Sequence, residues 1–409
     1  MRLRTTRPLK MSWILRGLRY QSPELRGALF YFFVFAITGA YEPFLTVYLA
    51  EMGLDGKEIG VLSAFFPLMS LVAAPIFSRL ADQRGVHRAV LVICLAGQAI
   101  GLGILQIPKT FLGMLPLILV YAIFRSPIQP ISDSLIVRMA IRHNLSYGKI
   151  RQWGSVSFAT VSLISGIVWK LMGYEWMFFA ASVLSLLVII PSLWLEPHDQ
   201  EEHQKKSVGR GSILSTMKNP LLLVLVLATF LVGAALGIGR TFESVYINYL
   251  GGNRQLIGAF YAISAYSEIP AMVFARWILR RLNGKKILIL AYTFILLAYI
   301  GYSLAQEPEW MLLLVVLKGV GFGLFFVTTV GLIDEIAPDH WKATAQSVVV
   351  AAGWGLGPLL ATLVGGVVFD VWGPASVFLV SAGLVAVAII LFLATRFPQK
   401  ETQPEISIQ

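Results

Sequence analysis

The chain alternates between long apolar runs and short polar segments along its length. A helix needs about 20 apolar residues to cross a lipid bilayer. By that measure the sequence predicts twelve membrane-spanning helices. They are expected at residues 27–50, 58–79, 88–107, 112–137, 152–171, 175–195, 220–248, 256–278, 286–305, 311–334, 343–368 and 374–395.

One long polar segment, residues 196–219, divides these runs into six and six. The pattern therefore predicts an all-α membrane protein with two pseudo-symmetric six-helix bundles, at residues 27–195 and 220–395. Residues 1–26 and 396–409 are expected to be cytoplasmic tails, and residues 196–219 a cytoplasmic linker.

Composition and charge support a membrane protein and exclude several other classes. The chain is 57% hydrophobic and only 13% charged, whereas soluble domains carry about 25% charged residues. The net charge of +11 resides in segments between apolar runs, so we expect no nucleic-acid partner. With one cysteine and no histidine inside a predicted span, we expect neither a metal, a cofactor nor an enzyme active site.

The placement of lysine and arginine predicts the orientation in the membrane. If the N-terminus is cytoplasmic, the outer segments hold only Lys57, Lys109, Lys170 and Arg254. All other basic residues in the segments between the apolar runs then lie on the cytoplasmic side. Cytoplasmic loops carry an excess of Lys and Arg. We therefore expect a multi-pass protein of the cell membrane, with both termini in the cytoplasm.

Seven ionisable residues lie well inside the predicted spans and an eighth, Arg151, stands at the head of the fifth span; such residues commonly mark functional sites. They are Glu42, Arg125, Asp133, Arg151, Arg240, Glu243, Glu268 and Lys318. Four acids and four bases fit mutual neutralisation around a polar cavity.

Several of these charges have candidate partners. Asp133 and Arg151 face each other across one short loop, and the alternative to a binding site is an ion pair that only sets a helix angle. Glu42 lies at a depth similar to that of Arg125, although it could instead be hydrated near the outer surface. Arg240 lies one helical turn before Glu243, close enough for a local pair.

The segment SRLADQRGVHR after the second span resembles the signature loop of the major facilitator superfamily. Asp82, Arg84, Gly85 and Arg88 match that loop, whereas Ser78 replaces its usual first glycine. The resemblance implies a tight cytoplasmic turn in which Asp82 helps to lock the outward-facing state. A basic turn that only obeys the positive-inside rule would explain the arginines but not the aspartate.

The stretch from Asp133 to YGKIRQWGSVSF resembles the lactose permease group and its phenylpropionate- and nucleoside-permease-like relatives. This resemblance implies that Asp133 and Arg151 bind the substrate and that Phe158 stacks on it. It also points to Glu268 for substrate binding and proton coupling. The pair formed by Glu243 and Lys318 resembles a largely structural charge pair of that group. The candidate substrate-binding residues are Asp133, Arg151, Phe158, Arg125, Glu42 and Arg240.

Two departures from that group weaken the analogy. The run ILILAYTFILLAYIGYSLA of the ninth span has no charge, and Gly321 and Leu324 stand in the tenth span where a histidine and a glutamate would be expected. Another proton site is therefore needed. Glu268 is our candidate, because it lies just before Pro270, where a proline in a spanning helix often marks a bend beside a cavity.

These features predict a monomeric secondary active transporter for a small solute: a sugar, a nucleoside or an aromatic acid. It is expected to work by alternating access as a proton symporter, with the proton and the lipid bilayer as its other partners. The alternative on the same fold is an exporter of amphipathic compounds or lipids. A membrane enzyme or a sensor would need a catalytic cluster or an appended soluble domain, and the sequence shows neither.

Overall fold

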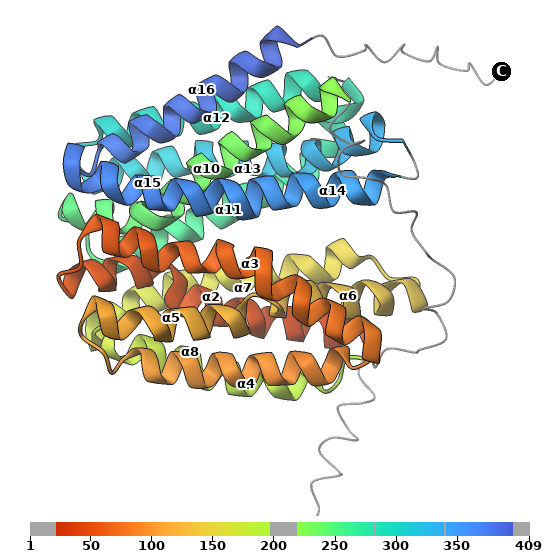
Figure 1. Cartoon of the computed structure of the whole chain (residues 1–409), viewed down its shortest axis with the longest axis vertical. Coiled ribbons are helices and arrows are strands. Elements are labelled where there is room, and N and C mark those ends of the chain that lie inside the picture. The colour runs from red at the N-terminus through yellow and green to blue at the C-terminus, as the bar shows by residue number, and fades with distance from the viewer. Residues whose placement is uncertain (1–21, 197–218, 282, 339–340, 396–409) are drawn as a thin grey trace, which may run out of the picture.

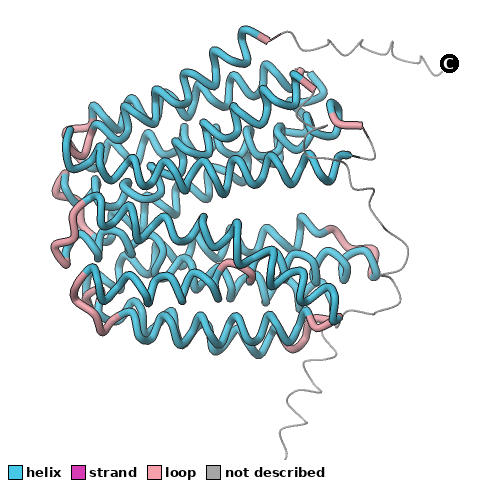
Figure 2. The backbone as a smooth tube through the Cα atoms, viewed as in Figure 1, coloured by secondary structure: helices cyan, strands magenta, loops and turns pink. Residues whose placement is uncertain are grey.

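The structure is a computed structural model that describes residues 22–196, 219–281, 283–338 and 341–395. The predicted linker, apart from its end residues 196 and 219, and the C-terminal tail lie outside the described residues. So do residues 1–21 of the N-terminal tail. Within the described residues the chain is helical and contains no strand (Figure 2).

Twelve stretches of the described chain are long and apolar enough to cross a membrane. The first six are α2 (Pro23–Glu51), α3 (Gly56–Arg84), α4 (His87–Leu105), α5 (Phe111–Arg125) with α6 (Ile128–Arg142), α7 (Tyr147–Met172) and α8 (Glu175–Ser192). The second six are α10 (Pro220–Tyr249), α11 (Arg254–Arg281), α12 (Gly284–Leu304), α13 (Pro308–Ile336), α14 (Lys342–Val350) to α15 (Gly357–Trp372), and α16 (Ser376–Ala394). Each predicted span is confirmed, with ends shifted by a few residues.

Local sequence explains several helix ends. Asp55 accepts a hydrogen bond from the backbone N–H of Glu58, whose side chain in turn accepts from the N–H of Asp55, so the two form a capping box that starts α3. Asn283 caps α12 through the N–H of Lys286. Gly85 ends α3 with a φ of 65°, a left-handed conformation that glycine adopts without steric cost.

Two spans are interrupted where the sequence predicted continuous helices. The fourth span breaks at Ser126 and Pro127 into α5 and α6, because a proline has no N–H to continue the helical hydrogen bonds. The eleventh contains a π-helical turn, Ala351–Leu356, immediately before α15. Pro358 lies in the first turn of α15, so the irregularity here is a widened turn that precedes the proline.

The two halves form separate bundles that converge at the end opposite the chain termini and diverge toward the termini (Figure 1). Glycines allow close contact at the converging end. A Cβ on Gly258 of α11 would collide with the carbonyl oxygen of Ser162 on α7, and one on Gly60 of α3 would lie 2.5 Å from that of Thr362 on α15. No side chain larger than hydrogen fits there without moving a helix.

Polar contacts also join the halves at this end. The carboxylate of Asp370, at the end of α15, accepts hydrogen bonds from the backbone N–H groups of Gly56 (2.6 Å) and Lys57 (3.0 Å) at the start of α3. On the other side, Arg254 of α11 donates to the carbonyl of Trp169 (3.0 Å) and pairs with Glu51 (3.3 Å). The structure is therefore closed at the end away from the termini.

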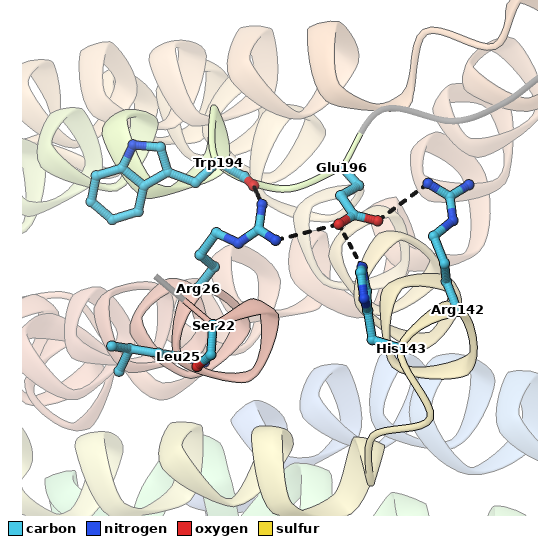
Figure 3. Close-up of polar contacts among 7 residues, drawn as sticks. All are labelled: Ser22, Leu25, Arg26, Arg142, His143, Trp194 and Glu196. Atoms are coloured by element: carbon cyan, nitrogen blue, oxygen red, sulfur yellow. Dashed lines mark hydrogen bonds and ion pairs between the residues drawn. The ribbon is translucent and has the colours of Figure 1, made fainter. Parts of the chain in front are cut away.

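A cluster of ion pairs ties the ends of three helices together within the first half (Figure 3). The carboxylate of Glu196, which follows α8, contacts Arg26 of α2 (3.3 Å), and Arg142 (3.2 Å) and His143 (2.7 Å) at the end of α6. Arg26 also donates to the carbonyl of Trp194 (3.1 Å). These contacts fix the terminus-side end of α6, the helix that carries Asp133.

Candidate functional site

Asp133 lies on α6 and is held by two neutral donors. The hydroxyl of Tyr31 on α2 donates to its Oδ1 atom (2.5 Å), and the side-chain amide of Gln129, one helical turn earlier on α6, donates to the same atom (2.7 Å). The hydroxyl of Tyr147 lies 3.3 Å from that of Tyr31. The carboxylate is therefore anchored through one of its two oxygens.

Arg151 lies near the start of α7 and packs on aromatic rings. The central carbon of its guanidinium lies 4.3 Å from the ring centroid of Phe35 and 5.4 Å from that of Tyr31. Stacking on ring faces is a common way to hold a guanidinium.

The predicted direct pairing of Asp133 with Arg151 is wrong for this structure. No ion pair joins them at 4.0 Å or less, although the structure describes both residues. Tyr31 separates them, because its hydroxyl binds the acid while its ring face holds the base.

Phe158 lies two helical turns beyond Arg151 on α7. It is half-buried and packs against a small cluster formed by Ala159 and, on α11 of the other half, Ala262 and Ala265. The structure therefore places this predicted stacking residue where the two halves meet.

Glu42 and Arg125 form an ion pair between α2 and α5 (2.9 Å). The Nε of Arg125 also donates to the hydroxyl of Tyr41 (3.0 Å), and its guanidinium lies 5.4 Å from the ring centroid of Phe66. The pairing expected from their similar depth is thus present.

Glu243 and Lys318 form a buried ion pair between α10 and α13 (2.6 Å). The ammonium of Lys318 also lies 5.0 Å from the ring centroid of Phe260. The local pair expected between Arg240 and Glu243 does not form, because the carboxylate of Glu243 turns toward the lysine instead.

Glu268 on α11 and Arg240 on α10 are left without ionic partners. Neither side chain makes an ion pair or a hydrogen bond to any residue in the described part of the chain. Glu268 is half-buried, and Lys318, Arg240 and Arg151 act on it electrostatically. Since Arg151 belongs to the first half, this interaction reaches across the two bundles.

The helix that carries Glu268 packs closely on α13. A Cβ on Gly319 would lie 2.7 Å from the carbonyl oxygen of Ser264, and one on Gly323 would lie 2.8 Å from that of Glu268. These glycines, four residues apart, let the backbones of α11 and α13 approach each other closely.

The signature loop between α3 and α4 lies at the terminus-side end. Asp82 contacts His87 (2.8 Å) and Arg138 of α6 (3.9 Å), while Arg88 donates to the carbonyl of Leu193 (3.2 Å). Arg84 is exposed. In this structure Asp82 therefore contacts residues of its own half.

Sequence reasoning missed the aromatic and amide groups that hold the charges. Tyr31, Phe35, Tyr41 and Gln129 were not selected, although each is in direct contact with a candidate charge. Only Gln129 had a usable signal, since it stands four residues before Asp133 and so shares its helix face.

The sequence profile of the MFS_1 like family matches residues 25–380. The chain is 29% identical over 374 residues to the maltose permease of Geobacillus stearothermophilus, covering 90% of this chain and 94% of that protein. It is 27% identical over 368 residues to the multidrug resistance protein MdtG of Escherichia fergusonii, covering 85% and 88%.

Among solved structures, the fold is similar to the crystal structure of the nucleoside transporter NupG. The TM-score is 0.79 at 18% sequence identity, and the match covers 91% of this chain and 99% of that one.

Proposed function

The chain belongs to the MFS_1 like family and is a multi-pass membrane transporter rather than an enzyme, and we propose that it is a secondary active transporter. Its solute, we propose, is small and bears hydroxyl groups. A sugar or a nucleoside is the solute class that we favour. The protein works as a monomer by alternating access between its two six-helix halves.

One observation carries this proposal. Of the eight charged groups predicted within the spans, four form two ion pairs, whereas Asp133, Arg151, Arg240 and Glu268 have no ionic partner among the described residues. Unpaired charges are costly in a membrane protein unless a ligand, water or polar groups compensate them. Two of the four come from each half, as expected for residues that bind one solute between the bundles.

The closed end supports alternating access. If the termini are cytoplasmic, as the lysine and arginine distribution predicts, the glycine contacts and the hydrogen bonds of Asp370 close the outer side. The conformation would then be inward-facing.

We propose Glu268 as the proton site. Its carboxylate lacks a direct partner, whereas Glu42 and Glu243 are paired with bases and Asp133 is anchored by Tyr31 and Gln129. A nearby cation favours the ionised carboxylate, whereas an environment without water favours the neutral one. When the site changes from one side of the membrane to the other, its hydration changes, so Glu268 can bind a proton on one side and release it on the other.

The test is uptake of labelled sugars and nucleosides into right-side-out vesicles, with and without a proton gradient. Glu268→Gln should abolish gradient-driven accumulation but keep exchange of solute across the membrane. Glu309→Gln is the matched control, because Glu309 is an exposed carboxylate at the start of α13. Accumulation that survives in Glu268→Gln with unchanged pH dependence would move the proton site to Glu42 or the coupling to another ion.

The relative MdtG favours a second candidate function, the export of amphipathic compounds. Inverted vesicles that accumulate amphipathic dyes, together with right-side-out vesicles that take up neither sugars nor nucleosides, would support this alternative.

A further inference from the structure

We propose that Tyr31 is a positioning residue that holds Asp133 and Arg151 apart, so that both side chains face a solute instead of each other. This inference rests on the proposed function, and it narrows the solute to one that presents neighbouring hydroxyl groups.

The first step is the way in which Asp133 is held. The side chains of Tyr31 and Gln129 both donate to Oδ1. A carboxylate has about four acceptor positions on two oxygens. Two donors on one oxygen leave part of this capacity unused, so this half-buried side chain can still accept from a ligand.

The second step is the position of Arg151. A carboxylate and a guanidinium a few ångströms apart attract each other strongly wherever water is scarce. Here the base instead lies over the rings of Tyr31 and Phe35, and its five N–H donors make no ion pair within the described residues.

The third step is the rigidity of the spacer. Tyr31 is fully buried in the first third of α2, and its ring centroid lies 6.3 Å from that of Phe35, one turn away, and 6.4 Å from that of Tyr147. A ring packed in this way cannot swing aside. It therefore imposes a fixed separation between the acid at its hydroxyl edge and the base on its face.

The solute class follows from this arrangement. An acceptor at Asp133 beside donors at Arg151 suits a group that both donates and accepts, such as two neighbouring hydroxyls of a sugar or of a ribose. A simple aromatic acid would use the guanidinium and leave the aspartate facing a like charge. Among the solutes considered from the sequence, the geometry thus favours sugars and nucleosides over aromatic acids.

The decisive variant is Tyr31→Phe, which removes the hydroxyl and keeps the ring. We expect Asp133, deprived of the shorter of its two hydrogen bonds to Oδ1, to turn to Arg151, so that a structure of the variant shows an ion pair within 4 Å. The KM for the sugar or nucleoside should rise on the order of tenfold, while kcat changes little. The reason is that Asp133 and Arg151 then bind each other, and the solute must break this pair before it can bind.

Two further variants complete the design. Tyr48→Phe is the matched control: it makes the same change on the same helix, at a buried tyrosine whose hydroxyl meets Lys109 instead of Asp133, and it should leave KM unchanged. Gln129→Met removes the second donor to Oδ1 and should raise KM in the same direction by less. It also keeps the test open if Tyr31→Phe does not fold.

The outcomes separate the two proposals. If Asp133 and Arg151 stay unpaired in the structure of Tyr31→Phe, the positioning role is overturned whatever the transport data show. If the pair forms but the wild-type protein takes up neither sugars nor nucleosides, the proposed function fails while the positioning role stands. Uptake of an aromatic acid with a KM that Asp133→Asn leaves unchanged would overturn the inferred solute class.

Discussion

Two ion pairs occupy equivalent places in the two halves of the molecule. Glu42 on the first helix of its half pairs with Arg125 on the fourth span, and Glu243 on the first helix of the other half pairs with Lys318 on the fourth span there. The environments differ. The side chains of Arg125 and Glu42 are 24% and 30% exposed, whereas those of Lys318 and Glu243 are 11% and 1% exposed.

The number of supporting contacts differs as well. Arg125 also binds the hydroxyl of Tyr41 and stacks near Phe66, so its position does not depend on Glu42 alone. Lys318 has the carboxylate of Glu243 and the ring of Phe260.

Acids and bases thus stand at matching positions in the two halves, but the burial of each pair decides what it can do. A partly hydrated pair can exchange one partner for a solute hydroxyl or water at little cost. A dry pair cannot, since each separated ion would have to be desolvated without compensation. We therefore propose that the pair of the first half belongs to the solute site and that the pair of the second half is structural.

The largest expected effect comes from breaking the dry pair. Lys318→Ala leaves the carboxylate of Glu243 buried and alone, which should destabilise the protein by about 3–5 kcal/mol. The matched change Arg125→Ala should cost about 1 kcal/mol, because Glu42 can be hydrated. Thermal unfolding in detergent measures both. Equal losses of stability in the two variants would show that the difference in burial has no energetic consequence.

A smaller effect is expected when both members of a pair are replaced together. Glu243→Leu with Lys318→Met should regain most of the lost stability and retain transport, because apolar residues often replace a buried pair without loss. Glu42→Leu with Arg125→Met should also fold but lose transport. Vesicle uptake and thermal unfolding of the two double variants decide this. Lost transport in a stable Glu243 and Lys318 double variant would assign that pair to the solute site too.

The sequence predicted the helices well, because twenty-residue apolar runs leave a membrane chain few alternatives. It also predicted the pairing of Glu42 with Arg125 from their similar depth. The sequence failed to predict the arrangement of Asp133 and Arg151, because a third side chain lies between them. Nothing in the spacing of Asp133 and Arg151 reveals that the ring of Tyr31, more than a hundred residues earlier, lies between them.

The irregular spans show the same limit. Pro127 and Pro358 each favour a break or a bend in the helix, because a proline lacks the N–H that would bond to the preceding turn. The form of each irregularity was not predictable. A short interruption between α5 and α6 and a π-helical turn before α15 satisfy the same local constraint, and packing against the neighbouring helices selects between them. Gly353 in that turn meets Thr229 of α10, a contact that no local pattern encodes.

The smallest expected effect tests whether the guanidinium of Arg125 matters beyond its charge. Arg125→Lys keeps the charge and the attraction to Glu42, but an ammonium lacks the planar fork that reaches Glu42 and Tyr41 together and that stacks near Phe66. We expect a KM raised a few-fold, with thermal stability close to that of the wild type.

The control for this prediction is Arg84→Lys, the same substitution at an exposed arginine of the signature loop. It should change neither KM nor stability. If Arg125→Lys also transports with the wild-type KM, the pair of the first half acts only as a charge, and its stacking and tyrosine contacts serve packing. A KM raised in Arg125→Lys alone would instead mean that the shape of the guanidinium helps to order the solute, because the charge is the same in both side chains.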